Sequence, residues 1–118
     1  MNQTETDQQT QSQPKEQPVV LCKECQSVVT EPDAAIQVEG SHEHTFRNPA
    51  GYSFHVLCFA SAPGTIEVGA PTEAASWFPG YAWSLALCAN CHQHLGWWYE
   101  GKSIFVGLIA TRLVRPQT

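Results

Sequence analysis

Residues 76–98 read SWFPGYAWSLALCANCHQHLGWW, and most of the features on which the fold depends lie in this segment. Its centre, Ala82–Leu87, has strand-like alternation, with Trp83, Leu85 and Leu87 on one face. A C-x2-C pair, Cys88 and Cys91, follows directly. The segment therefore predicts a strand that runs into a tight, thiol-bearing turn.

Two further segments resemble strands, and the punctuation between segments favours short elements. Tyr52–Leu57 alternates, and Ile104–Ala110 is a third candidate strand. Pro, Gly and Asn signals recur too often for a long helix, so we expect an all-β domain. These breakers are Asn48–Gly51, Ala62–Gly64, Gly69–Pro71, Pro79-Gly80 and Glu100-Gly101.

A second C-x2-C pair, Cys22 and Cys25, precedes the first by 62 residues that carry most of the domain. Two tight turns, each with two thiolates, can form a tetrahedron that suits Zn²⁺ and leaves no position for a catalytic water. We therefore expect a structural zinc ion held by Cys22, Cys25, Cys88 and Cys91, one per chain.

Two other uses of these cysteines remain open at this point. Cys88–His92 matches C-x-x-C-H, the covalent haem attachment motif, but that interpretation requires export and leaves the first pair unexplained. A redox dithiol is the other, although neither pair lies in a βαβ pattern of the thioredoxin type.

The composition predicts one folded domain after a polar tail. Residues 1–18 contain six Gln and no apolar residue except Met1, so we expect them to be disordered, with residues 19–118 forming the domain. A chain of 118 residues with 42% hydrophobic content has room for one modest core.

The charge balance bears on partners and location. Eleven acidic residues against six basic ones give a net charge of −5, which repels phosphate backbones and offers no patch for an anionic membrane. There is no apolar run of membrane-spanning length and no signal-peptide pattern. We therefore expect a cytoplasmic protein that binds neither nucleic acid nor membrane.

All four tryptophans fall after residue 76, whereas the first 50 residues contain one aromatic residue, Phe46. The plain explanation is core packing. A Pro-Gly turn between Trp77 and Trp83 can, however, fold the two indoles toward each other. Trp97 and Trp98 are adjacent in a strand-like stretch, so they face opposite sides, and one of them can line a pocket.

Several other side chains invite functional interpretations. Cys58, the fifth cysteine, follows an apolar run and is expected to be a buried small hydrophobe. His42 and His44 are expected to be solvated. His92 and His94 flank the second cysteine pair, and we expect them to support it through hydrogen bonds.

At these residues the sequence resembles the CULT-domain family, the thalidomide-binding modules of cereblon proteins, and especially its free-standing bacterial members. The resemblance covers roughly residues 19–115. Its landmarks are the two cysteine pairs together with Asn48-Pro49-x-Gly51-Tyr52, Ser76–Trp83 and His94–Trp97.

The resemblance implies a β-tent, in which two antiparallel sheets meet at the zinc site. It also implies a cage of three indoles that holds a cyclic imide, such as the glutarimide ring of thalidomide-type drugs, a uracil-like ring or a cyclised protein C-terminus. The implied ligand-binding residues are Asn48, Pro49, Phe54, Ala75, Ser76, Trp77, Trp83, Trp97 and Tyr99.

The family pattern would make the Ala75 carbonyl accept the imide N–H and the Trp77 N–H donate to an imide carbonyl. This chain departs from cereblon at Ala74-Ala75, where Glu-His stands in that protein. A side-chain bond from the histidine position is therefore lost, and we expect binding with altered affinity. No segment resembles the one that docks a ubiquitin-ligase adaptor, so a degradation role does not follow.

The sequence thus predicts a non-catalytic, zinc-stabilised binding module for cyclic imides or uracil-like rings. One rival is an enzyme, because β-tent relatives include methionine sulfoxide reductases and Cys58 could be the nucleophile. No basic residue lies beside Cys58 in the sequence to lower its pKa. A second rival is an interaction module whose indoles bind a partner's side chain or terminus.

Overall fold

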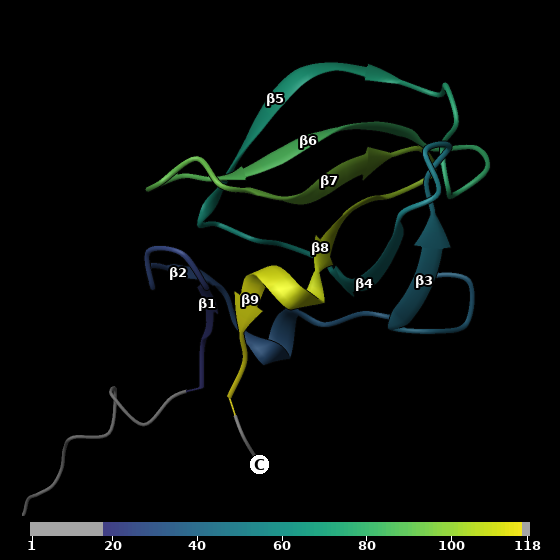
Figure 1. Ribbon diagram of the computed structural model, residues 1–118. Helices are drawn as coiled ribbons and strands as arrows, with labels where there is room; N and C mark the ends of the chain where they lie inside the picture. The colour runs from purple at the N-terminus through teal and green to yellow at the C-terminus, as the bar shows by residue number, and fades with distance from the viewer. Residues whose placement is uncertain (1–17, 117–118) are drawn as a thin grey trace, which may run out of the picture.

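The computed structural model describes residues 18–116. The predicted disordered tail, residues 1–18, therefore lies outside the described part except for Pro18. Within residues 18–116 the chain has no α-helix, and its regular structure consists of strands and two short 3-10 turns, Pro32–Ala34 and Ala110–Arg112 (Figure 1). This confirms the all-β fold class.

The strands form two antiparallel sheets (Figure 1). The smaller has the order β2-β1-β9 and the larger the order β3-β4-β8-β7-β6-β5. The strands are β1 (Val20–Cys22), β2 (Val28–Thr30), β3 (Glu43–Arg47), β4 (Ser53–Phe59), β5 (Thr65–Thr72), β6 (Ala82–Cys88), β7 (His94–Glu100), β8 (Ile104–Ile109) and β9 (Leu113–Val114).

The three predicted strands correspond to β4, β6 and β8. β6 and β8 begin at the predicted residue and end one residue away from it, whereas β4 begins one residue later and ends two residues later than predicted. The sequence did not predict β5, because its Gly69–Pro71 segment resembles a turn. β5 lies at the edge of the large sheet and pairs with β6 alone. An edge strand tolerates Pro, and Gly69 (φ +92°) lies where the β5–β6 register shifts between Val68 and Thr72.

One apolar core joins the two sheets. Val20 and Val29 of the small sheet are buried in the same cluster as Leu57, Leu95 and Leu108 of the large sheet. Cys22 and Cys88 belong to this cluster, so the cysteine pairs lie at the junction of the sheets. The predicted architecture of two sheets meeting at a cysteine cluster is confirmed.

A second, aromatic cluster lies elsewhere in the large sheet. Phe78 packs edge-on against Tyr99 and Phe105, with ring centroids 4.9 and 5.1 Å apart. The rings of Tyr99 and Phe105 stack at 5.0 Å. All three residues are at most 2% exposed, so this cluster is a rigid base for whatever packs above it.

Gly96 lets strands β7 and β8 approach closely beside Trp97. A Cβ atom at Gly96 would lie 1.9 Å from the carbonyl oxygen of Gly107, which a real side chain cannot occupy. Glycine is therefore required at position 96 for this strand pairing.

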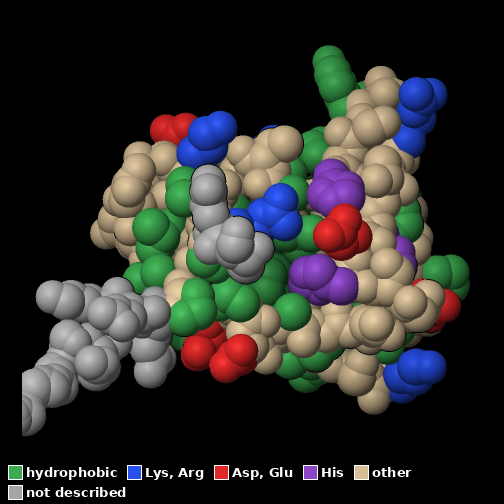
Figure 2. Space-filling view, turned by 90° about the horizontal axis from the view of Figure 1, so that it is seen from below, with side chains coloured by type: hydrophobic (Ala, Val, Ile, Leu, Met, Phe, Trp, Pro, Cys, Tyr) green, Lys and Arg blue, Asp and Glu red, His purple; other side chains and the backbone are tan. Residues whose placement is uncertain are grey.

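The sequence contains six Lys and Arg residues. On the face seen in Figure 2, the Lys and Arg side chains stand apart from one another rather than gathering in a patch. Within the described residues, the structure contains no helix with the length and apolar character needed to cross a membrane.

Candidate metal centre and aromatic pocket

The four predicted cysteine ligands meet in space. Their Sγ atoms all lie within 4.8 Å of one another, and the Cys22–Cys91 and Cys25–Cys88 pairs are each 3.6 Å apart. Zinc–sulfur bonds of about 2.3 Å place the sulfurs of a tetrahedral site about 3.8 Å apart. The cluster therefore fits a four-thiolate zinc ion without rearrangement.

The two cysteine turns share one backbone geometry. The amide of Gln26 donates to the carbonyl of Cys22 at 2.7 Å, and the amide of His92 donates to the carbonyl of Cys88 at 2.9 Å. Gln26 and His92 have positive φ angles of 65° and 67°. Each turn therefore reverses the chain at the fourth residue after its first cysteine, which directs both thiols of a pair to the same point.

Polar neighbours favour the ionised form of one ligand. Hydrogen bonds from the Asn90 side chain and from Ser27 lower the pKa of the Cys25 thiol to about 6. The Ser27 hydroxyl lies 3.1 Å from the Cys25 sulfur and 3.4 Å from the Cys88 sulfur. A metal-bound thiolate needs such donors, and only the contacts of the folded chain identify Ser27 and Asn90 as their source.

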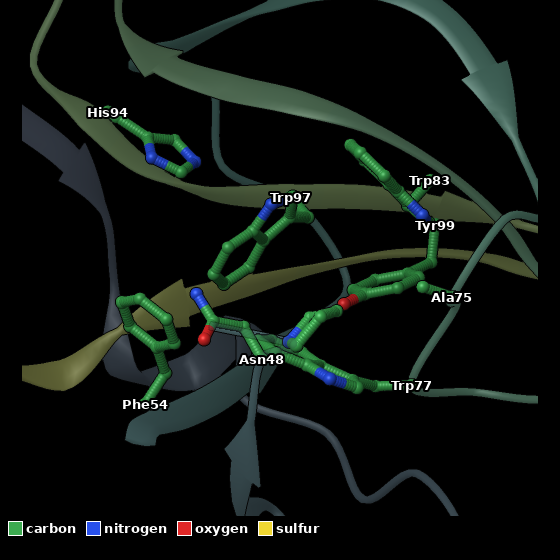
Figure 3. Close-up of a pocket in the computed structure, with 9 residues that line it drawn as sticks. Asn48, Phe54, Ala75, Trp77, Trp83, His94, Trp97 and Tyr99 are labelled. Atoms are coloured by element: carbon green, nitrogen blue, oxygen red, sulfur yellow. The ribbon is translucent and has the colours of Figure 1, made fainter. Parts of the chain in front are cut away.

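A cavity of about 280 Å³ is lined by residues of the large sheet and its loops, and none of the lining residues is a cysteine (Figure 3). Eight of the nine predicted ligand-binding residues line it. These residues are Asn48, Pro49, Phe54, Ala75, Trp77, Trp83, Trp97 and Tyr99.

Ser76, the ninth, does not line the cavity. Its hydroxyl accepts a hydrogen bond from the Phe78 amide at 3.3 Å and donates to the Phe78 carbonyl at 3.1 Å. Ser76 therefore shapes the turn that carries Trp77. The sequence signal for these local hydrogen bonds is a Ser two residues before the Phe of a Phe-Pro-Gly turn.

The walls of the cavity are mainly aromatic, and the Trp97 ring is nearly perpendicular to two of its neighbours. Trp77 and Trp97 meet at 4.9 Å with an interplanar angle of 78°, and Phe54 meets Trp97 at 5.6 Å and 80°. Phe46 stacks on Trp77 at 4.8 Å and 11°. The Trp77 ring is therefore packed against neighbours rather than free to rotate, which preforms that side of the cavity.

The loop between β5 and β6 contributes Ala75 and Trp77 to the cavity lining. Ala75 has a left-handed backbone (φ +54°), which is uncommon for a residue other than glycine. Among the described residues, the Ala75 carbonyl and the Trp77 amide N–H have no hydrogen-bond partner. Two residues that line the cavity therefore carry one main-chain acceptor and one main-chain donor without a partner in the described part of the chain.

Asn48 lies in the turn before β4. Its side-chain oxygen accepts the Tyr52 amide at 2.9 Å, and its own amide N–H donates to the Tyr52 carbonyl at 2.8 Å. The turn uses the oxygen of the side chain, so its NH₂ group is the polar end left for the cavity (Figure 3).

His94 also lines the cavity, and the sequence did not predict this. Its Nε2 lies 2.9 Å from the Gly96 carbonyl oxygen, and its ring meets Trp97 edge-on at 5.1 Å. Arg112 donates to the His94 carbonyl at 2.8 Å. Burial, together with the Arg112 charge, lowers the pKa of His94. The expectation that His94 supports the cysteines was wrong, since its hydrogen bonds go to Gly96 and Arg112.

Cys58 is fully buried within the aromatic cluster. Burial raises the pKa of its thiol to about 12, so it carries no thiolate at neutral pH. This agrees with a small hydrophobic side chain, and nothing at Cys58 supports the reductase alternative.

Comparisons with known proteins agree with the cysteine site. Residues 18–103 match the family described as Yippee zinc-binding/DNA-binding/Mis18, centromere assembly. The chain is similar to cereblon of Danio rerio (35% identity over 81 residues, 66% of this chain and 19% of that protein) and of Gallus gallus (35% over 80 residues, 66% and 18%). It thus spans about a fifth of these relatives. With zinc-binding cysteines in place and the family match covering most of its length, the chain belongs to the Yippee/Mis18 family and carries a cereblon-like domain of that type.

Proposed function

We propose that this chain is a non-catalytic CULT-type module that captures cyclic imides or uracil-like rings in the cavity walled by Trp77, Trp83 and Trp97. One observation carries the proposal. The carbonyl of Ala75 and the amide of Trp77, both without partners among the described residues, lie at a cavity whose other walls are mainly aromatic.

The chemistry of a cyclic imide complements that arrangement. An imide places one N–H donor between two carbonyl acceptors. The Ala75 carbonyl accepts the N–H, and the Trp77 amide donates to one of the carbonyls. The remaining ring atoms are flat or saturated carbons that pack against indole faces. A few polar contacts in an apolar pocket then fix the orientation of the ligand.

The size of the cavity favours a single ring. Pockets for drug-sized ligands are roughly 300–1,000 Å³. At about 280 Å³ this cavity is slightly smaller than that range, so it suits one six-membered ring with any larger substituent left outside. A ring that terminates a longer molecule, such as a cyclised protein C-terminus, meets the same requirement.

The similarity to cereblon supports the ring-binding domain alone. The chain spans about a fifth of those proteins, so their other activities are not assigned to it. All three predicted cage tryptophans line the cavity, and Ala74-Ala75 replaces Glu-His without removing any main-chain group. The proposal therefore includes main-chain recognition of the ring and no side-chain bond from position 75.

The metal has a structural role in this proposal. One zinc ion, bound by Cys22, Cys25, Cys88 and Cys91, would link β1 of the small sheet to β6 of the large one. Four thiolates leave no coordination position for substrate. The metal therefore stabilises the fold and supplies no chemistry at the cavity.

We do not extend the DNA-binding part of the family description to this chain. A net charge of −5 opposes contact with phosphates, and binding by phosphate neutralisation requires clustered Lys and Arg. We propose a small-molecule or peptide-terminus ligand in the cytoplasm instead.

The test is a titration of glutarimide followed by tryptophan fluorescence, with N-methylglutarimide as the matched control. Methylation removes the N–H donor and adds bulk where the Ala75 carbonyl is expected to bind. We expect a saturable change with glutarimide and uracil, and at least about tenfold weaker binding of the methylated ring. Equal responses to both glutarimides, or no response to either imide or uracil, would refute the proposal.

A further inference from the structure

Tyr99 has a buried hydroxyl group at the cavity. The residue is 2% exposed and lines the cavity. Its hydroxyl has no hydrogen-bond partner among the described residues, whereas the hydroxyl of Tyr81, the other buried tyrosine of this region, lies 3.1 Å from the Ser103 hydroxyl. Buried phenol groups are usually paired, so the exception at Tyr99 needs an explanation.

The packing prevents this hydroxyl from turning away to find a partner. The Tyr99 ring is stacked on Phe105 and held edge-on by Phe78. Its backbone pairs with Trp83 on one side and Phe105 on the other, in the interior of the large sheet. Figure 3 shows the ring directed from its strand toward the middle of the labelled group, with the hydroxyl oxygen leading.

A buried hydroxyl without a hydrogen-bond partner destabilises the protein, and a ligand that supplies the missing hydrogen bond removes this penalty. Removing water from such a group without a replacement hydrogen bond is unfavourable. Burial also raises the pKa of Tyr99, so the group stays protonated at neutral pH. A phenol in that state has one donor and free acceptor lone pairs, and a ring with a polar atom at the buried end can use either.

We propose that the Tyr99 hydroxyl determines specificity in this pocket, selecting cyclic ureides over plain cyclic imides. The inference depends on the proposed function and refines its substrate class. Dihydrouracil is the informative ligand, because it differs from glutarimide by one ring N–H in place of a methylene. It keeps the imide N–H and both carbonyls, so the Ala75 and Trp77 contacts are the same for the two rings.

The experiment titrates glutarimide and dihydrouracil into the unaltered chain and into Tyr99→Phe. We expect the preference for dihydrouracil over glutarimide to fall by about three- to tenfold in the variant, the range of one ordinary hydrogen bond. Tyr81→Phe is the matched control, because it removes a buried hydroxyl that already has a partner outside the cavity. Its preference should equal that of the unaltered chain.

A second readout needs no ligand. Tyr99→Phe removes a hydroxyl that makes no hydrogen bond to the described part of the protein, so this variant should unfold at the same or a higher temperature than the unaltered chain. Tyr81→Phe removes a hydroxyl that has a partner and should unfold at a lower temperature. If Tyr99→Phe weakens both rings equally, or neither, the hydroxyl does not select the ligand and the inference is wrong. If neither ring binds the unaltered chain, the proposed function fails with it.

Discussion

The indole Nε1 of Trp83 donates a hydrogen bond to the carbonyl oxygen of Ala74 at 2.8 Å. A wall of the cavity thereby holds the loop that carries the next residue, Ala75, which lines the cavity and has a left-handed backbone. Trp83 thus has two separable roles, one as a flat surface and one as a hydrogen-bond donor. The same indole links the shape of the cavity to the placement of its main-chain groups.

Trp83→Phe separates these roles, because phenylalanine keeps an aromatic face and has no N–H. Without the indole hydrogen bond the loop is less ordered in the free protein, so part of the binding free energy is needed to order it. We therefore expect glutarimide affinity to fall by about three- to tenfold. Trp97→Phe is the matched control, since the Trp97 indole N–H has no partner among the described residues. It should weaken binding less. Equal losses in a fluorescence or calorimetric titration would show that the indole bond does not order the loop.

Ala75→Gly tests the left-handed residue itself. The left-handed conformation is unfavourable by roughly 1–2 kcal/mol for an L-residue but not for glycine. Glycine partly offsets this gain, because it has more conformational entropy in the unfolded chain. We expect unchanged or slightly higher thermal stability in Ala75→Gly, with imide binding kept. Ala74→Gly, whose backbone has an ordinary negative φ, should lose stability instead. The opposite order of melting temperatures would contradict the strain argument.

Local patterns were sufficient for much of the fold. The C-x2-C spacing at Cys22 and Cys88 predicts the two turns without knowledge of the rest, because thiol pairs on tight turns have few other uses. Strand alternation placed Trp97 and Trp98 on opposite faces, and in the structure Trp97 lines the cavity while Trp98 packs against the main core. The disordered tail and the domain boundary at residue 18 remain predictions.

Features that depend on distant contacts could not be predicted. β5 resembles a turn locally, and only its position at the sheet edge accommodates Pro71 and Gly69. The contact of Ser27 with two sulfurs arises once the cysteine pairs have met. The hydrogen bond from Arg112 to the His94 carbonyl joins residues 18 positions apart, so the sequence alone does not show it. The set of residues that line the cavity was predicted from the family resemblance and not from the periodicity of the sequence.

Removal of the metal should unfold the domain. Structural zinc in small domains contributes roughly 10–16 kcal/mol of apparent binding free energy, and here it joins the two sheets. We expect one zinc per chain by metal analysis, and loss of the folded circular dichroism signal on chelation or in Cys25→Ser. Cys58→Ala, which alters a cysteine outside the cluster, should keep the zinc. Full stability in zinc-free protein would rule out this role.

Deletion of residues 1–17 should leave the domain intact. Their polar, Gln-rich composition cannot bury enough apolar surface to compensate for ordering. A shortened chain that begins at Pro18 is expected to have the same melting temperature and the same glutarimide affinity as the full chain. A loss of either would assign these residues a structural or binding role.

Trp77 and Trp98 provide the sharpest comparison between pocket and core. Trp77 gives the cavity a wall ring and, through its amide N–H, a hydrogen-bond donor, and its neighbours are Phe46, Phe54 and Trp97. Trp98 points to the other side of the sheet, where its indole N–H donates to the Thr65 hydroxyl at 3.2 Å.

Trp77→Ala should therefore abolish imide binding, and Trp98→Ala should lower stability while the affinity of the folded fraction stays nearly unchanged. Burial of a large apolar side chain is worth roughly 1.5–3 kcal/mol and aromatic stacking about 0.5–1.5 kcal/mol more, which corresponds to a loss of one to three orders of magnitude in affinity. Glutarimide titration gives the affinity, and zinc content and circular dichroism confirm that both variants are folded. If Trp77→Ala bound glutarimide as tightly as the unaltered chain, the tryptophans of the cavity would be packing residues, and the main-chain groups of the loop would need another ligand.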